Sequence, residues 1–232
     1  MADITAIERP NRLPRSLSLL MILVYPILVK PLADSVVAVT QVSRQIDIDL
    51  IHEALGWLYV GLILAVLLVW ERRPIGAIGL RRPGWLTIVL GLGGAVACLL
   101  VGKLVGEAVN QFFPPASPPG AAAAAMTHGS VAYAVALAIR AGACEELLYR
   151  GIAIEQLSTF VGSRWVAGLI AGAMFVLAHA LVFDWPQLIP IGALTIVLTI
   201  LYLWRGDLWA NILAHILVDT VGLLAIILQT HP

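Results

Sequence analysis

Charged residues are scarce in this chain of 232 residues. Asp, Glu, Lys and Arg make up only 12% of the sequence, while hydrophobic residues make up 60%. A soluble domain carries about 25% charged residues. The composition is therefore typical of a protein that crosses a membrane several times, and it argues against a soluble domain.

The chain also lacks net charge and has little cysteine. The 14 basic and 14 acidic residues cancel, so nothing indicates a nucleic-acid partner. The two cysteines, Cys98 and Cys144, both lie in apolar segments. This placement argues against a disulfide or a cysteine metal site, and it favours small residues that pack between helices.

Long apolar segments fill most of the chain and predict an all-α, polytopic transmembrane helix bundle of about seven spans. Such spans cross roughly 30 Å of hydrocarbon at about 1.5 Å per residue. We expect Pro26 and Pro31 to kink the first span, and the polar stretch 45–53 to form an interfacial turn. The expected spans are about 16–42, 50–70, 85–109, one that starts near 130, 165–183, 188–204 and one that ends near 228.

The alternation of polar and apolar segments divides the chain into four parts. We expect a cytoplasmic N-terminal tail (1–15), N-terminal transmembrane helices (16–111), a Pro- and Ala-rich loop (112–129) and a C-terminal helical core (130–232). Most Lys and Arg residues fall on one side of the predicted bundle, and cytoplasmic loops carry an excess of these residues. We therefore expect a cytoplasmic N-terminus, in an integral multi-pass protein of a bacterial cell membrane.

Three ionisable side chains are expected at one depth of the bundle. Glu145 lies seventeen residues before Gly162, and His179 lies seventeen residues after it, so an antiparallel hairpin that turns at Gly162 places them level. His215 follows Gly206 by nine residues and reaches nearly the same depth from the same side. A charge near the centre of a membrane helix costs about 2.5–3.5 kcal/mol on insertion scales. These groups should therefore pair, titrate or do chemistry.

Spacing along the helices indicates which charges pair. Glu146 and Arg150 are four residues apart and can form an ion pair within one helix. That pair leaves Glu145, on another part of the helix surface, as the freer carboxylate. His215 and Asp219 are also four residues apart, so the carboxylate can orient the imidazole.

The same residues supply the parts of a hydrolytic site. A Glu and a His in a partly desolvated site can hold and deprotonate a water molecule. A second His can donate a hydrogen bond to a developing oxyanion. Phe175 lies one turn before His179 and can support its ring. Such a set can hydrolyse an amide without a covalent intermediate.

Three short motifs resemble those of a known family. The chain reads Glu145-Glu146-x-x-x-Arg150, then Phe175-x-x-x-His179, then His215-x-x-x-Asp219. In this order they resemble the CPBP family (CAAX protease and bacteriocin-processing, also called the ABI or type II CAAX prenyl endopeptidase family) of intramembrane glutamic proteases. The resemblance covers about 130–224, and it implies that 130–232 is a CPBP-like catalytic core.

The resemblance implies an endopeptidase that hydrolyses a peptide bond of a membrane-associated protein or peptide. By analogy, Glu145 with His179 would activate the water, and His215 with Asp219 would stabilise the oxyanion. The supporting residues of the site would be Glu146, Arg150 and Phe175.

One position departs from part of this family. The eukaryotic prenyl-protein members carry Asn where this chain has Asp219. Asn can donate a hydrogen bond to an oxyanion, whereas ionised Asp cannot. We therefore expect Asp219 to orient His215, or to donate only when it is protonated.

Two alternatives of other classes fit the same residues. A non-catalytic membrane protein of this fold could bind peptides or provide bacteriocin immunity. A proton-coupled carrier could use the carboxylates and histidines as a proton relay, although the sequence shows no inverted repeat and no paired broken helices.

Metal binding and one arginine also stay open from the sequence. One Glu and two His can ligate zinc, but the sequence has no H-E-x-x-H motif, and the resemblance favours a reaction without a cofactor. Arg140 lies five residues before Glu145. It can balance a carboxylate charge or contact a carboxylate of the substrate.

Overall fold

The computed structural model describes residues 13–113, 127–128 and 130–230, and every regular element in these ranges is helical. This result confirms the all-α prediction. The elements are α1 (Leu13–Thr40), α2 (Gln45–Ala65), η1 (Val66–Trp70), η2 (Ile75–Ile78), α3 (Trp85–Phe112), α5 (Val131–Glu145), η3 (Glu146–Ile154), α6 (Glu155–Val161), α7 (Arg164–His179), α8 (Trp185–Arg205) and α9 (Leu208–Thr230).

Five helical segments of the described chain are long and apolar enough to cross a membrane. They are Leu17–Thr40, Gln45–Trp70, Trp85–Phe112, Trp185–Arg205 and Leu208–Gln229. The other two predicted spans correspond to shorter helices. The fourth is divided into α5, η3 and α6, because a π-helix interrupts it after Glu145, and the fifth is the 16-residue helix α7. The structure therefore supports five of the seven predicted spans.

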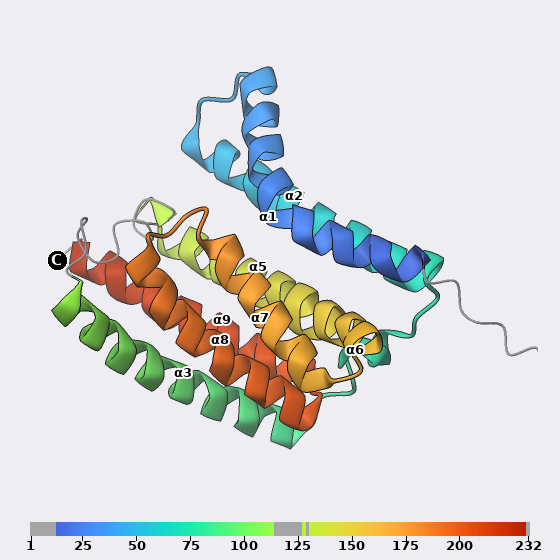
Figure 1. Ribbon diagram of the computed structural model, residues 1–232. Helices are drawn as coiled ribbons and strands as arrows, with labels where there is room; N and C mark the ends of the chain where they lie inside the picture. The colour runs from blue at the N-terminus through green and yellow to red at the C-terminus, as the bar shows by residue number, and fades with distance from the viewer. Residues whose placement is uncertain (1–12, 114–126, 129, 231–232) are drawn as a thin grey trace, which may run out of the picture.

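The helices form a bundle with a hairpin beside it (Figure 1). Within the bundle, α3 packs against α8 and α9, α5 packs against α9, and α7 packs against α8 and η3. The hairpin consists of α1 and α2, and α1 also contacts η3. The motif-bearing η3 therefore lies between the hairpin and the rest of the bundle.

The N-terminal hairpin differs in one respect from the sequence-based expectation. The stretch 45–53, predicted to be an interfacial turn, is the beginning of α2. Its polar side chains are paired, which makes a helix compatible with this composition. Gln45 donates to Asp49 at 2.8 Å, one turn away, and Glu53 accepts from Arg140 of α5 at 2.8 Å. As expected, α1 contains Pro26 and Pro31, and Figure 1 shows that it bends sharply.

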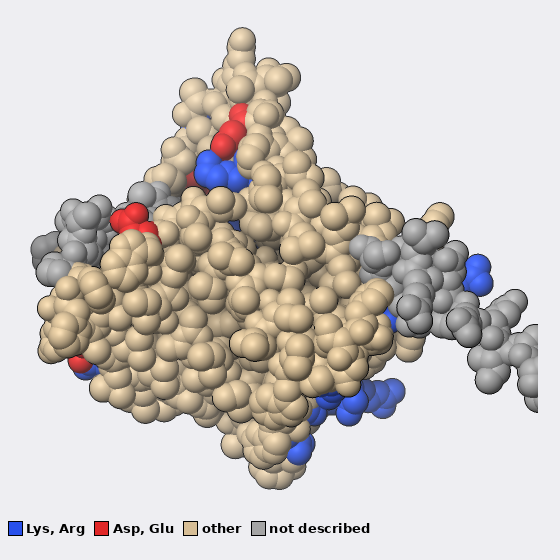
Figure 2. Space-filling model, in the orientation of Figure 1, with Lys and Arg blue, Asp and Glu red and all other residues tan. Residues whose placement is uncertain are grey.

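The two turns that set the depth of the candidate site are glycine turns. Gly162 ends α6 with φ +73°, and Gly206 ends α8 with φ +61°. Glycine adopts this left-handed conformation without a Cβ penalty and is the usual residue at a helix C-terminus. Lys and Arg side chains gather near the end of the bundle where α6 ends (Figure 2).

A third glycine brings two motif-bearing helices together. A Cβ placed on Gly142 of α5 would lie 2.8 Å from the backbone nitrogen of Ile216 in α9. Lipid tails are as apolar as the side chains of membrane helices, so the hydrophobic effect does not drive these helices together. Their association depends instead on close packing, which small residues allow. Gly142 thus lets the helix that ends at Glu145 lie directly against the helix that carries His215.

Candidate active site

The first motif lies at the junction between an α-helix and a π-helix. Glu145 is the last residue of α5, and Glu146 is the first residue of η3. Every residue of η3 is buried. Short π-helical segments inside α-helices occur frequently at functional sites.

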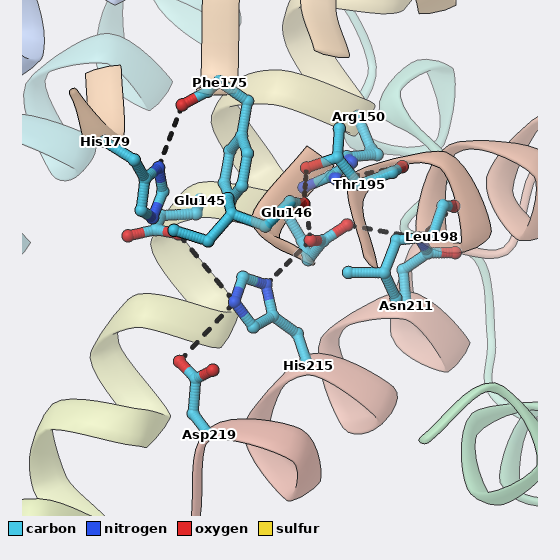
Figure 3. Close-up of polar contacts among 11 residues, drawn as sticks. Glu145, Glu146, Arg150, Phe175, His179, Thr195, Leu198, Asn211, His215 and Asp219 are labelled. Atoms are coloured by element: carbon cyan, nitrogen blue, oxygen red, sulfur yellow. Dashed lines mark hydrogen bonds and ion pairs between the residues drawn. The ribbon is translucent and has the colours of Figure 1, made fainter. Parts of the chain in front are cut away.

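Glu146 is the buried centre of a polar network (Figure 3). Its Oε1 accepts a hydrogen bond from Arg150 Nη1 at 2.6 Å and lies 2.8 Å from His215 Nδ1. Its Oε2 accepts from Asn211 Nδ2 at 3.2 Å. The side chains of Glu146 and Arg150 are 0% and 1% exposed. The ion pair expected from their spacing is thus present, and it is fully enclosed.

Arg150 connects this network to α7 and α8. Its guanidinium carbon lies 4.6 Å from the centroid of the Phe175 ring, and its Nη2 donates to the backbone oxygen of Thr195 at 3.5 Å. Phe175 in turn contacts His179, with ring centroids 4.4 Å apart. The backbone oxygen of Phe175 lies 2.9 Å from His179 Nδ1. We assign the proton to Nδ1, because a carbonyl oxygen can only accept, and this leaves Nε2 as the other reactive nitrogen of the ring.

His215 is surrounded by three carboxylates. Its Nδ1 faces Glu146 Oε1 at 2.8 Å, while its Nε2 lies 3.5 Å from Asp219 Oδ2 and 3.8 Å from Glu145 Oε2. The spacing of the motif led us to expect that Asp219 orients this ring. The shortest contact of the imidazole is instead with Glu146, and Asp219 makes a longer contact at the opposite nitrogen.

All four predicted catalytic side chains line one cavity. Glu145, His179, His215 and Asp219 all contribute to the wall of a cavity of about 460 Å³. The side chain of Glu145 is 18% exposed, whereas that of Glu146 is 0% exposed. The two adjacent glutamates therefore differ sharply: one is enclosed by donors, and the other faces open space.

Arg140 lines the same cavity, and its charge partner comes from the N-terminal hairpin. Its Nε donates to Glu53 Oε2 of α2 at 2.8 Å, and the two side chains are 18% and 13% exposed. Of the roles considered for Arg140, charge balance thus has a partner in the structure. The sequence did not suggest Glu53, because it lies far from Arg140 along the chain.

Asn211 is a member of the network that the sequence reasoning missed. Its Nδ2 donates both to Glu146 and, at 2.7 Å, to the backbone oxygen of Leu198. A sequence signal does exist: Asn211 lies four residues before His215, on the same face of a helix. That face of α9 therefore carries Asn211, His215 and Asp219 at successive turns.

The cysteines and possible metal ligands were also located. Cys98 and Cys144 are buried free thiols, as expected for packing residues. Within 13–113, 127–128 and 130–230, no group of three or more His, Cys, Asp or Glu side chains has an arrangement that could hold a metal ion.

Comparison with known protein families gives a match in the C-terminal part of the chain. Residues 127–221 match the family model described as Type II CAAX prenyl endopeptidase Rce1-like. This match agrees with the CPBP resemblance found from the three motifs, and the matched range contains every predicted site residue. Searches against curated proteins and against solved structures found no match. The description names an endopeptidase, and five helices of the described chain are long and apolar enough to cross a membrane, so the two findings together support a membrane-bound peptidase.

Proposed function

We propose that this chain is an intramembrane endopeptidase that uses a water molecule activated by Glu145 and His179. Its substrate would be a membrane-associated protein or peptide. The observation that carries this proposal is the contrast between the two adjacent glutamates. Glu146 is held by Arg150 and Asn211 within the protein, while Glu145 faces a cavity that it shares with His179.

In the proposed reaction, Glu145 is the general base. Its carboxylate takes a proton from water, and the water oxygen attacks the carbonyl carbon of the scissile peptide bond. The same proton then passes to the leaving amine as the carbon–nitrogen bond breaks. His179 holds the water through Nε2, since its Nδ1 is engaged by the carbonyl of Phe175. Fixing the ring in this way positions the water at little entropic cost during the reaction.

His215 is the proposed oxyanion donor. When both of its nitrogens carry protons, Nδ1–H is directed at Glu146 and Nε2–H is available to the developing oxyanion. Asp219, 3.5 Å from Nε2, supports the charged form of the ring and limits its rotation. Arg150 neutralises Glu146, and Phe175 supports both Arg150 and His179.

We propose that α7 and the segment from α5 to α6 also cross the bilayer, which gives seven spans. The proposed orientation has the N-terminus in the cytoplasm, with the basic turns that contain Arg164 and Arg205 on the same side.

We also propose that no metal takes part in the reaction. This proposal is tested by incubating the active protein with a strong zinc chelator. Unchanged activity supports the proposal, while loss of activity that zinc restores would replace it with a zinc mechanism.

The endopeptidase proposal is tested with two otherwise identical cell lines. One expresses this chain, and the other expresses Glu145→Gln, which keeps the size of the side chain and removes the base. New N- and C-termini of membrane and secreted proteins are then quantified by mass spectrometry. Termini that appear only with Glu145 would support the peptidase and identify its substrate.

Two other results would remove the peptidase proposal. If the termini match but the variant loses a phenotype such as peptide resistance, the protein acts as a binding or immunity protein, or as a carrier. If neither termini nor phenotype differ, Glu145 is a structural group.

A further inference from the structure

A second, smaller hollow adjoins the cavity that contains Glu145. It has a volume of about 190 Å³ and lies between α1 and α7, beside Tyr149 of η3. Three residues line both spaces: Pro26 of α1, Tyr149 of η3 and Ala178 of α7. The two hollows are therefore adjacent, with these three residues between them. We call the smaller one the α1–α7 slot.

The walls of the α1–α7 slot are apolar and reach the surface of the molecule. Leu23 and Ile27 of α1 are 51% and 61% exposed, and Leu177 and Leu181 on the opposite wall are 68% and 63% exposed. In a membrane-spanning bundle, exposed leucines and isoleucines face lipid tails. The slot is thus bounded by lipid on one side and by the Glu145 cavity on the other.

The helix that forms one wall of the slot has a weak point at Pro26, which lines both hollows. Pro26 has no N–H and cannot donate the helical hydrogen bond to the carbonyl of Ile22, so α1 bends more easily there. α1 packs mainly against α2 and η3. The slot can therefore widen on the side of α1 that faces α7.

We infer that the α1–α7 slot is the side entrance through which an apolar, extended segment of a membrane-embedded peptide passes from the bilayer to Glu145. The identity of this occupant as a substrate rests on the proposed function. The apolar walls select against charged residues at the entrance, since a charge among lipid and leucine side chains is costly.

The chemistry beyond the slot favours a peptide over a lipid tail. The cavity presents Glu145, His179, His215 and Arg140. Backbone amides of an extended peptide can hydrogen-bond to these groups. An acyl chain would remove water from them and would offer no hydrogen bonds in its place. A cavity of this size also lies within the range of pockets that enclose small ligands.

The experiment follows the path of a probe peptide and does not require cleavage. The full-length protein in liposomes is mixed with a twelve-residue, leucine-rich peptide that carries a photoreactive diazirine, and the adducts are located by mass spectrometry after illumination. Val182 and Leu223, which line the Glu145 cavity, report arrival at the site. We expect adducts there and on the slot residues Leu23 and Leu177.

Two pairs of matched variants test the route. Leu23→Trp and Leu177→Trp fill the slot from either wall. Leu20→Trp on α1 and Leu169→Trp on α7 make the same change at positions that are 56% and 74% exposed and do not line the slot. We expect each slot variant to reduce cavity adducts at least tenfold and each control to stay within twofold of the unmodified protein. Equal yields in all four variants would overturn the inference.

Two further arms separate this inference from its alternatives. In the first, a diazirine fatty acid replaces the peptide as the probe. If the fatty acid labels the slot, and the peptide neither labels the slot nor reduces labelling by the fatty acid, the slot holds lipid and the inference is wrong. If the peptide enters by the slot but no cell-line cleavage depends on Glu145, the entrance stands and the endopeptidase proposal fails. If cleavage depends on Glu145 but the slot variants cleave normally, only the entrance is refuted.

Discussion

Replacing Arg150 by Met removes the guanidinium from the buried network and keeps most of the apolar stem. In the structure, Arg150 Nη1 lies 2.6 Å from Glu146 Oε1, with side-chain exposures of 1% and 0%. The variant leaves Glu146 as a buried carboxylate without its full-charge partner. Removing one member of a buried ion pair costs about 3–5 kcal/mol. At roughly 2–4 °C per kcal/mol for a chain of this size, the unfolding temperature should fall by roughly 6–20 °C.

The assay is thermal unfolding of the purified protein in lipid nanodiscs, followed by tryptophan fluorescence. Arg164→Met is the matched control, since Arg164 pairs with Glu155 but its side chain is 45% exposed. Exposed ion pairs contribute about 0–1 kcal/mol, so this control should unfold within a few degrees of the unmodified protein. The double variant Glu146→Gln/Arg150→Met removes both charges and should regain most of the lost stability. Equal unfolding temperatures for Arg150→Met and Arg164→Met would refute the reasoning.

Three further changes test individual contacts. Asn211→Ala deprives Glu146 Oε2 and the Leu198 carbonyl of a donor and should lower the unfolding free energy by about 1–3 kcal/mol; a chemical denaturation curve identical to that of the unmodified protein would contradict this role. His179→Ala should reduce the cleavage rate by roughly 10²–10⁴-fold without a large change in unfolding temperature, whereas a matching loss of folded protein would indicate a structural role. Asp219→Asn should retain more activity than Asp219→Ala in a comparison of kcat, because Asn can still contact His215 Nε2; the reverse order would exclude a positioning role for Asp219.

The proximity of the candidate-site residues to one another was predictable from local sequence features. Gly162 and Gly206 mark helix ends through a backbone conformation that other residues rarely adopt. Counting residues from these two turns brought Glu145, His179 and His215 to one level, and all three line one cavity. The Glu146–Arg150 pair followed from helical spacing in the same way.

Other features depend on contacts between distant segments and left no clear local signal. The polar residues of 45–53 are part of a helix, and one of them, Glu53, pairs with Arg140 of α5, which is distant along the chain. The π-helix after Glu145 contacts α1, α7 and α9, which are formed by distant parts of the chain. It also divided the fourth predicted span. Likewise, the contact of His215 Nδ1 with Glu146, which is shorter than that of Nε2 with Asp219, joins α9 to η3.

The most direct test of the central claim is the turnover of a peptide taken from the cleavage site found in the cell-line comparison. Purified protein in nanodiscs is compared with Glu145→Gln and with Glu107→Gln, which makes the same change at a side chain of α3 that is 62% exposed. The account predicts that Glu145→Gln loses cleavage by at least about 10²-fold, while all three proteins unfold at similar temperatures and Glu107→Gln keeps full activity. Cleavage by Glu145→Gln within a few-fold of the unmodified protein would contradict the assignment of Glu145 as the base.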